Sequence, residues 1–196
     1  MEKIREVIQQ SVEVKQQLLS DEKLVRCIRE VVHVMVGSLR TGGRVMFCGN
    51  GGSAADAQHL AAELSGRFYF DRPPLPAEAL HVNTSYLTAV ANDYGYDEVF
   101  ARMVRGQGRK GDVLVGLSTS GNSPNVVKAF QAAREMGITV VAFTGAGGGE
   151  MAPLADLLLN VPSADTPRIQ EAHILIGHIV CQLVESELFA AKEPVK

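Results

Sequence analysis

Four hydroxyl side chains crowd into one short loop of this 196-residue chain. Ser118, Thr119, Ser120 and Ser123 lie between an apolar, β-branched run and a run with helical spacing. Where a parallel strand leads into a helix, the first N–H groups of the helix lack partners and attract an anion, and hydroxyls add further donors. An ordinary capped helix start needs only one hydroxyl. We therefore interpret the loop as a phosphate-binding site, with a serine cap as the alternative.

A second loop, Gly49-Asn50-Gly51-Gly52-Ser53, also joins a strand-like run to a helix-like run. Glycine lets the backbone approach a ligand closely, because it tolerates positive φ and has no side chain. The loop matches neither a dinucleotide fingerprint nor a P-loop, so a nucleotide ligand lacks its usual support. Ligands of open parallel sheets gather at the carboxyl ends of the strands, where both loops are expected. The alternative is a tight turn with Ser53 as a cap.

A histidine and a glutamate on the next predicted helix are candidate catalytic or metal-binding residues. His59 and Glu63 are four residues apart, so they share one helix face and suit acid–base catalysis or metal binding. A surface hydrogen bond is the simpler alternative. The last helix carries Gln170, His173 and His178 in an apolar sequence, and buried polar groups need partners. Glu63 is a candidate partner for His178, and a core histidine bonded to a carbonyl is the alternative.

The elements that position these groups alternate between strand and helix. This order predicts an α/β fold, a three-layer αβα sandwich with a five-stranded parallel sheet covered on both faces. Helices are expected over 2–19, 21–39, 53–66, 86–91, 98–106, 126–137 and 166–190, strands over 44–48, 78–82, 113–117, 138–143 and 157–161, a turn at 92–95 and a flexible loop at 145–149.

The length indicates a single domain over 1–196, with a helical extension at 1–41 and the sheet with its helices over 44–190. The last helix is apolar on much of its circumference. A helix of this kind is usually buried, and in so small a domain a subunit interface is the expected place.

The composition argues against several classes of protein. The net charge is −3, with no clustered Lys/Arg stripe, so we expect neither nucleic acid nor membrane as a partner. Cys27, Cys48 and Cys181 are well separated and form neither a paired disulfide framework nor a Cys-x-x-Cys motif. They are interpreted as buried thiols of a reducing compartment. The charged N-terminus and the lack of a long apolar run predict a cytoplasmic protein.

A family resemblance rests on four segments in order: CGNGGSAADAQHLAAELSGRF, AVANDYGYDEVF, LSTSGNSPNV and TPRIQEAHILIGHIV. Together they resemble the sugar isomerase (SIS) family, and within it the branch that acts on sedoheptulose 7-phosphate, over nearly the whole chain. The resemblance implies a homotetramer with active sites at subunit interfaces. It also implies conversion of the substrate to D-glycero-D-manno-heptose 7-phosphate, which feeds ADP-heptose synthesis for the lipopolysaccharide core or related surface glycans.

The resemblance also implies a role for individual residues. Glu63 and His178 match the catalytic pair, and one zinc ion per subunit would be held by His59, Glu63, Gln170 and His178. Pro167 replaces an aspartate that relatives carry, which leaves any role of that aspartate in doubt. The residues that match substrate contacts are Asn50, Gly51, Gly52, Ser53, Arg67, Asn92, Asp93, Ser118, Thr119, Ser120, Ser123 and Gln170.

The isomerisation itself requires two proton-transferring groups, such as Glu63 and His178. Moving a carbonyl between C2 and C1 of a sugar phosphate needs a base for the carbon-bound proton, a role for Glu63, and a group that shuttles protons between the oxygens, a role for His178. Two of the implied zinc ligands are far apart for a single ion. Gln170 and His178 lie roughly 12 Å apart along a continuous helix and about 80° apart around it. Binding one ion requires an irregular helix start or ligands from different subunits.

Rival functions remain from other classes. Non-catalytic SIS relatives bind the bacterial replication initiator protein and keep the serine-rich loop, but they lack the glutamate and histidine that this chain retains as Glu63 and His178. A sugar-phosphate-sensing transcription regulator would need a DNA-binding domain for which the chain has no room. An isomerase for a pentose or hexose phosphate is the nearest enzymatic alternative.

Overall fold

The computed structural model describes residues 1–189, which fold around a five-stranded parallel sheet of order β2-β1-β3-β4-β5. The strands are short, apolar runs whose side chains are mostly buried, as expected for a sheet covered on both faces. Their bounds are β1 Val45–Gly49, β2 Ala77–Ala79, β3 Val113–Ser118, β4 Thr139–Thr144 and β5 Leu157–Asn160.

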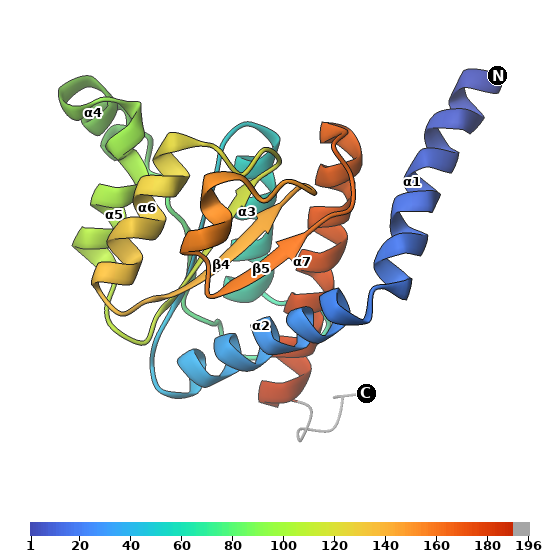
Figure 1. Ribbon diagram of the computed structural model, residues 1–196. Coiled ribbons are helices and arrows are strands. Elements are labelled where there is room, and N and C mark those ends of the chain that lie inside the picture. The colour runs from blue at the N-terminus through green and yellow to red at the C-terminus, as the bar shows by residue number, and fades with distance from the viewer. Residues whose placement is uncertain (190–196) are drawn as a thin grey trace.

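Helices cover the two faces of the sheet (Figure 1). One face carries α2 (Glu22–Arg40), α3 (Gly52–Ser65) and the long α7 (Thr166–Phe189). The other face carries α4 (Thr84–Tyr94), α5 (Val99–Gln107) and α6 (Pro124–Glu135), with the short 3-10 helices η1 (Tyr96–Glu98) and η2 (Gly149–Leu154). The three-layer α/β arrangement with a parallel sheet confirms the predicted fold class.

Strand alternation divides the core into two parts. Val113 and Val115 of β3 belong to the cluster beneath α2, α3 and α7, whereas Leu114 belongs to the cluster beneath α5 and α6. Successive side chains of a strand point to opposite faces, so a short apolar run fills both layers at once. Phe47 and Cys48 of β1 divide between the two clusters in the same way.

The first helix, α1 (Glu2–Ser20), stands away from the body of the molecule (Figure 1). Only Val14 and Leu18 of this helix are buried, while apolar side chains near its start are exposed, including those of Ile4 and Ile8. The hydroxyl of Ser11 donates to Glu171 of α7, which ties the middle of α1 to the start of α7.

Three local expectations were wrong. The turn predicted at 92–95 begins too early, because 92–94 complete the last turn of α4 and Gly95 ends that helix at φ +91. The strand predicted at 78–82 ends at Ala79, where the chain turns and the N–H of Val82 bonds to the carbonyl of Ala79. The loop predicted at 145–149 runs at Gly149 into η2.

The three cysteines differ in burial. Cys48 and Cys181 are buried, as predicted, and burial raises the pKa of each thiol to about 12. Cys27 is only half-buried, because it lies on α2 at the edge of the sheet, where its thiol donates to the carbonyl of Leu158. Its pKa is raised mainly by burial. All three are free thiols.

The burial expected for the last helix is found within the domain, in α7, and the expected subunit interface stays a prediction. This helix is long and apolar enough to cross a membrane by length and composition alone. It is instead packed within the fold, against α2 and α3, and it buries the polar side chains of Arg168, His173 and Glu185. These contacts identify α7 as a core helix of the domain.

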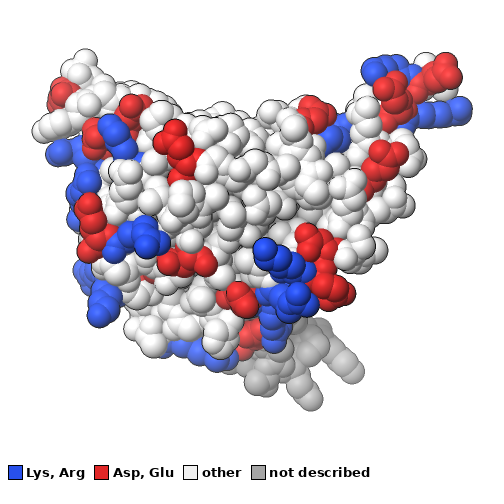
Figure 2. Space-filling model, viewed as in Figure 1, with Lys and Arg blue, Asp and Glu red and all other residues white. Residues whose placement is uncertain are grey.

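Charges of both signs are interspersed on the surface (Figure 2). Several of them pair, as Lys128 does with Glu98 at 2.9 Å and Arg29 with Glu187 at 3.0 Å. The face in view shows no extended area of Lys and Arg alone.

Candidate active site

Both candidate loops leave the sheet at the point where its strand order reverses. From β1 the chain continues to β2 on one side, whereas β3 is followed by β4 and β5 on the other. Gly49 at the end of β1 pairs with Leu117 near the end of β3, so the two loops emerge side by side. The crevice at such a switch point is where open parallel sheets bind their ligands.

The hydroxyls of the serine loop, residues 118–123, face one another. The Oγ atom of Ser118 lies 2.9 Å from that of Ser123 and 3.5 Å from that of Ser120. Gly121 adopts φ +69, and its N–H closes the turn onto the carbonyl of Ser118. Ser123 occupies the N-cap position of α6 but makes no side-chain capping hydrogen bond. The cluster therefore differs from the ordinary serine cap and gathers donors at the start of a helix, as a phosphate site does.

An amide pair that the sequence did not point out joins the two loops. Asn50 and Asn125 each donate to the other's side-chain oxygen, at 2.8 and 2.9 Å. Asn125 is buried at the start of α6, and the hydroxyl of Tyr96 donates to Asn50 at 3.2 Å. The glycine-rich loop, the serine loop and η1 are thus fixed relative to one another. The available signal was an asparagine in the first turn of a helix, directly after the serine loop.

Beside the loops, α3 and α7 bring together two imidazoles and a carboxylate. Nε2 of His59 lies 2.9 Å from Nε2 of His178 and 3.1 Å from Oε1 of Glu63. Glu63 is partly buried, and the side chain of His59 is 50% exposed. The three residues predicted from the helix patterns therefore form one cluster, and Glu63 and His178 contribute to it from separate helices.

Asp56, one turn before His59 on α3, is an acidic neighbour that the sequence analysis missed. Burial raises the pKa of its carboxyl group, while His59 and His178 act in the opposite direction. Its Oδ2 atom is buried without a hydrogen-bond partner within the described residues 1–189. An aspartate three residues before a candidate histidine was the signal that could have found it.

The cluster has the donor set and spacing of a metal site. The ligand atoms of His59, Glu63 and His178 all lie within 4.8 Å of one another. Two imidazole nitrogens and a carboxylate oxygen are ligands that zinc prefers. Because two facing Nε2 atoms share only one proton at hydrogen-bond distance, a cation that accepts both lone pairs satisfies them better. The residues present therefore fit a zinc ion.

Gln170 lies against the glycine-rich loop. A Cβ atom added to Gly52 would come within 2.6 Å of its amide nitrogen. α7 is one continuous helix from Thr166 to Phe189, so the separation of about 12 Å from His178 along the axis applies. Gln170 thus lies beside the glycine-rich loop, and its roles as a substrate contact and as a fourth zinc ligand stay predictions.

The remaining predicted residues lie in varied surroundings. Ser53 is buried in the first turn of α3, and Thr119 is partly buried. Arg67 is exposed just after α3, and Asn92 and Asp93 are exposed at the end of α4, where they bond to each other. Over residues 1–189, no hydrogen bond or ion pair joins these last three to the loops or the histidine cluster. Their substrate roles remain predictions.

The fold and the site have counterparts among known proteins. The family model described as the SIS domain matches residues 8–145, most of the sheet and both loops. The protein is therefore a SIS-domain protein, and the expected membership of this family is confirmed.

More similar relatives narrow the family further. The chain is 63% identical over 161 residues to a phosphoheptose isomerase of Rhodospirillum rubrum, covering 82% of this chain and 86% of the relative. It is 54% identical over 188 residues to one of Mycobacterium bovis, covering 96% of both. The solved structure of phosphoheptose isomerase GmhA from Neisseria gonorrhoeae superposes with a TM-score of 0.89 at 46% identity, over 94% of this chain and 98% of the other. The chain belongs to the phosphoheptose isomerases, a family of aldose–ketose isomerases.

Proposed function

We propose that the protein converts D-sedoheptulose 7-phosphate to D-glycero-D-manno-heptose 7-phosphate. The observation that carries the proposal is the cluster of Glu63, His59 and His178, with ligand atoms within 4.8 Å of one another. It supplies a carboxylate and imidazoles for proton transfer in a domain whose serine loop can hold a phosphate. Relatives at 54–63% identity are phosphoheptose isomerases, which supports the same reaction here.

The serine loop anchors the phosphate group of the substrate. Ser118, Ser120 and Ser123 gather their hydroxyls at the N-terminus of α6, where the helix dipole favours an anion. Neutral donors suffice, which agrees with a net charge of −3 on the chain. With the phosphate held there, the remainder of the sugar extends over the glycine-rich loop, where Asn50 and Gln170 are placed to contact its hydroxyl groups.

Glu63 acts on carbon and His178 acts on oxygen. The carboxylate of Glu63 takes a proton from C1 of the ketose, which leaves an enediol, and returns a proton to C2. His178 moves a proton from the oxygen on C1 to the oxygen on C2, so that the carbonyl group ends at C1. One base can serve both carbons because they are adjacent, and no other bond is broken.

His59, Glu63 and His178 would hold a zinc ion, with Gln170 as a proposed fourth ligand. When bound, the ion polarises the substrate carbonyl and stabilises negative charge on its oxygen. Oε1 of Glu63 contacts His59. A carboxylate that binds metal is a weaker base, so with an ion bound the ligand role of Glu63 would compete with its role as a base.

We further propose that the protein works as a cytoplasmic homotetramer with active sites at subunit interfaces. The exposed apolar side chains of α1 and the half-exposed His59 support this, because a second subunit could cover both. The product would enter ADP-heptose synthesis for the lipopolysaccharide core or related surface glycans. The high identity to enzymes does not favour the non-catalytic relative that binds the replication initiator.

A coupled assay tests the proposal. Sedoheptulose 7-phosphate and ketose phosphates of five and six carbons are each offered to the protein, with and without a chelator. We expect the highest kcat/KM with the seven-carbon ketose and loss of activity with the chelator. A higher kcat/KM with a pentose or hexose phosphate would contradict the substrate assignment, and full activity with the chelator would contradict the zinc assignment.

A further inference from the structure

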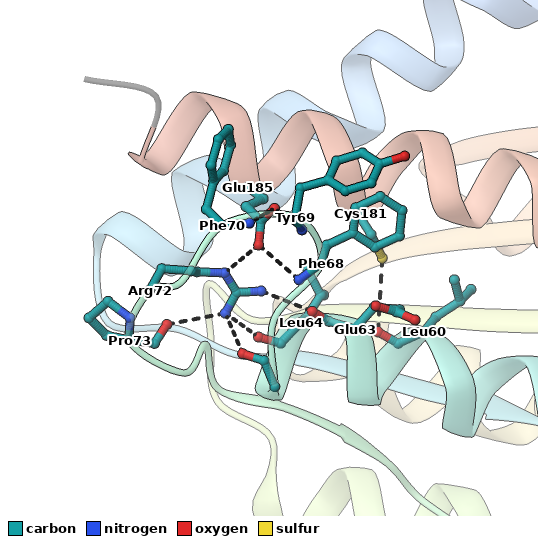
Figure 3. Close-up of polar contacts among 11 residues, drawn as sticks. Leu60, Glu63, Leu64, Phe68, Tyr69, Phe70, Arg72, Pro73, Cys181 and Glu185 are labelled. Carbon is teal, nitrogen blue, oxygen red and sulfur yellow. Dashed lines mark hydrogen bonds and ion pairs between the residues drawn. The ribbon is translucent and has the colours of Figure 1, made fainter. Parts of the chain in front are cut away.

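A loop after α3, residues 66–73, crosses to α7 before the chain returns to the sheet at β2 (Figure 3). At its centre lies a buried ion pair in which Nε of Arg72 is 2.9 Å from Oε1 of Glu185. The two side chains are 1% and 0% exposed. A buried ion pair is costly in desolvation and is weak evidence for stability by itself. Its presence beside the proposed site therefore calls for a functional account.

Glu185 holds the loop by its backbone. The carboxylate accepts the N–H groups of Phe68, Tyr69 and Phe70 at 2.9, 2.6 and 3.0 Å, besides the bond from Arg72. Burial favours the neutral acid, but these backbone bonds and Arg72 outweigh it and hold the pKa of Glu185 below its usual value. An ionised carboxylate with four donors fixes the loop to α7 firmly.

Arg72 holds the end of α3 in turn. One terminal nitrogen donates to the carbonyls of Leu64, Gly66 and Pro73, and the other donates to the carbonyl of Glu63 at 2.9 Å. The last carbonyls of a helix lack partners within the helix. A cation at this end also interacts favourably with the negative end of the helix dipole. Arg72 thus bonds directly to the peptide group of the proposed base, as Figure 3 shows.

The Arg72–Glu185 pair is also connected to His178, through α7 and through Phe68. Glu185 and His178 are seven residues apart on α7, which is roughly 10 Å along one face of the helix. Phe68, whose N–H is bound by Glu185, places its ring 5.8 Å from the imidazole ring of His178. Gly177 allows α7 to lie close to α3 there, since a Cβ atom would come within 2.5 Å of Leu60.

We propose that Arg72 and Glu185 are positioning residues that set Glu63 on α3 against His178 on α7 for proton transfer. The pair joins the end of one helix to the side of the other through the 66–73 loop. It touches neither the reacting atoms nor the phosphate loop. The inference rests on the proposed isomerisation, in which Glu63 and His178 must both face the same two carbons of the substrate.

The test compares three variants with the wild type. Glu185→Gln keeps the shape but removes the charge, and Arg72→Met with Glu185→Leu removes both charges, which restores stability lost when one buried partner is missing. Asp112→Asn is the matched control. Asp112 is also a buried carboxylate that accepts backbone N–H groups, from Arg44 and Arg109, but it lies at the amino end of β3.

Three experiments are made: unfolding, which gives the midpoint, steady-state kinetics with sedoheptulose 7-phosphate, which give kcat and KM, and NMR of the side chains of His59 and His178. We expect kcat to fall roughly 10- to 100-fold in Glu185→Gln and in the double variant, the effect usual for groups that orient others in a site. KM should stay within about twofold, because uniform binding through the phosphate is untouched. The histidine signals should shift in both variants and stay unchanged in Asp112→Asn.

The proposal would be overturned if the double variant were as stable as the wild type, with unchanged kcat and unshifted histidine signals. The Arg72–Glu185 pair would then have only a structural role. If Glu185→Gln does not fold, the double variant alone decides. If the wild type does not isomerise sedoheptulose 7-phosphate, the proposed function fails, while the histidine signals still show whether the pair positions the two helices.

Discussion

Nε2 of His59 and Nε2 of His178 lie 2.9 Å apart, although 119 residues separate them in the chain. α3 and α7 run alongside each other beneath the sheet, and they aim both rings at a space that Glu63 also faces. At this distance one nitrogen donates and the other accepts, and the tautomers decide which. The same geometry that favours this hydrogen bond favours a cation in its place, and it supplies the proposed proton carrier beside the proposed base.

Zinc should bind to this cluster with release of protons, since the ligating imidazoles must be deprotonated. We expect about one ion per subunit, and in His59→Gln an affinity lower by roughly tenfold or more, the loss that even outer groups of metal sites cause. Calorimetric titration in two buffers of different ionisation enthalpy measures both affinity and proton release. His33→Gln, at an exposed histidine on α2, is the control, and wild-type affinity in His59→Gln would exclude the site.

Removal of two hydroxyls from the serine loop should weaken binding of the phosphorylated substrate. Each neutral hydrogen bond contributes about 1 kcal/mol, so Ser120→Ala with Ser123→Ala should raise KM roughly 30-fold. kcat should change less, because the loop holds the phosphate and not the reacting carbons. Steady-state kinetics measure the effect, with Ser85→Ala on the exposed face of α4 as control. A KM equal to that of the wild type would show that the phosphate binds elsewhere.

The amide pair of Asn50 and Asn125 should show energetic coupling. Replacing either residue by alanine leaves the other amide without its partner, at a cost of about 1–3 kcal/mol in the free energy of unfolding. The double replacement should cost less than the sum, with a coupling of roughly 0.5–3 kcal/mol. Urea denaturation of the two single variants and the double variant gives this number. Additive losses would mean that the two amides act independently.

His173 should make stability depend on pH. It is fully buried, and burial lowers its pKa to about 4, although the bond to the carbonyl of Thr144 acts the other way. Because the folded pKa lies below the unfolded one, the unfolded chain binds the proton first. The contribution of His173 to the free energy of unfolding is therefore fully present above about pH 6.5. It is lost as the pH falls toward about 4, by roughly 3 kcal/mol in all.

His173→Gln keeps a donor for Thr144 but does not titrate. Urea denaturation between pH 4.5 and 7 should therefore give a flatter curve for this variant than for the wild type. His33→Gln, at an exposed histidine, should follow the wild type. Parallel curves for His173→Gln and the wild type would contradict the account of His173.

The strands, the main helices and the two loops could be predicted from the sequence because short apolar runs and glycine-rich or serine-rich junctions are local signals. The turn at 92–95 was misplaced because Gly95, and not Asn92, ends the helix. Long-range contacts gave weaker signals. Helix spacing pairs His59 with Glu63. Their meeting with His178 is predicted by a polar residue in an apolar helix and by the family resemblance, and not by any local pattern that joins the two helices.

Other parts of the site were not predictable from local patterns. The Asn50–Asn125 pair depends on the register of β1 against β3, which brings two loops together. The Arg72–Glu185 pair depends on the path of the 66–73 loop across α7. Neither residue of that pair belongs to a motif, and from the sequence alone each would be interpreted as an ordinary charged residue on the surface. Only the fold shows that both are buried.

The most direct test of the central claim compares the wild type with Glu63→Gln and His178→Gln in turnover of sedoheptulose 7-phosphate. Loss of a general base or of the proton carrier should lower kcat by roughly 10²- to 10⁴-fold, with the oligomeric state unchanged by light scattering. Asp112→Asn should retain its activity. Wild-type turnover by either Glu63→Gln or His178→Gln would contradict the assignment of proton transfer to these two residues.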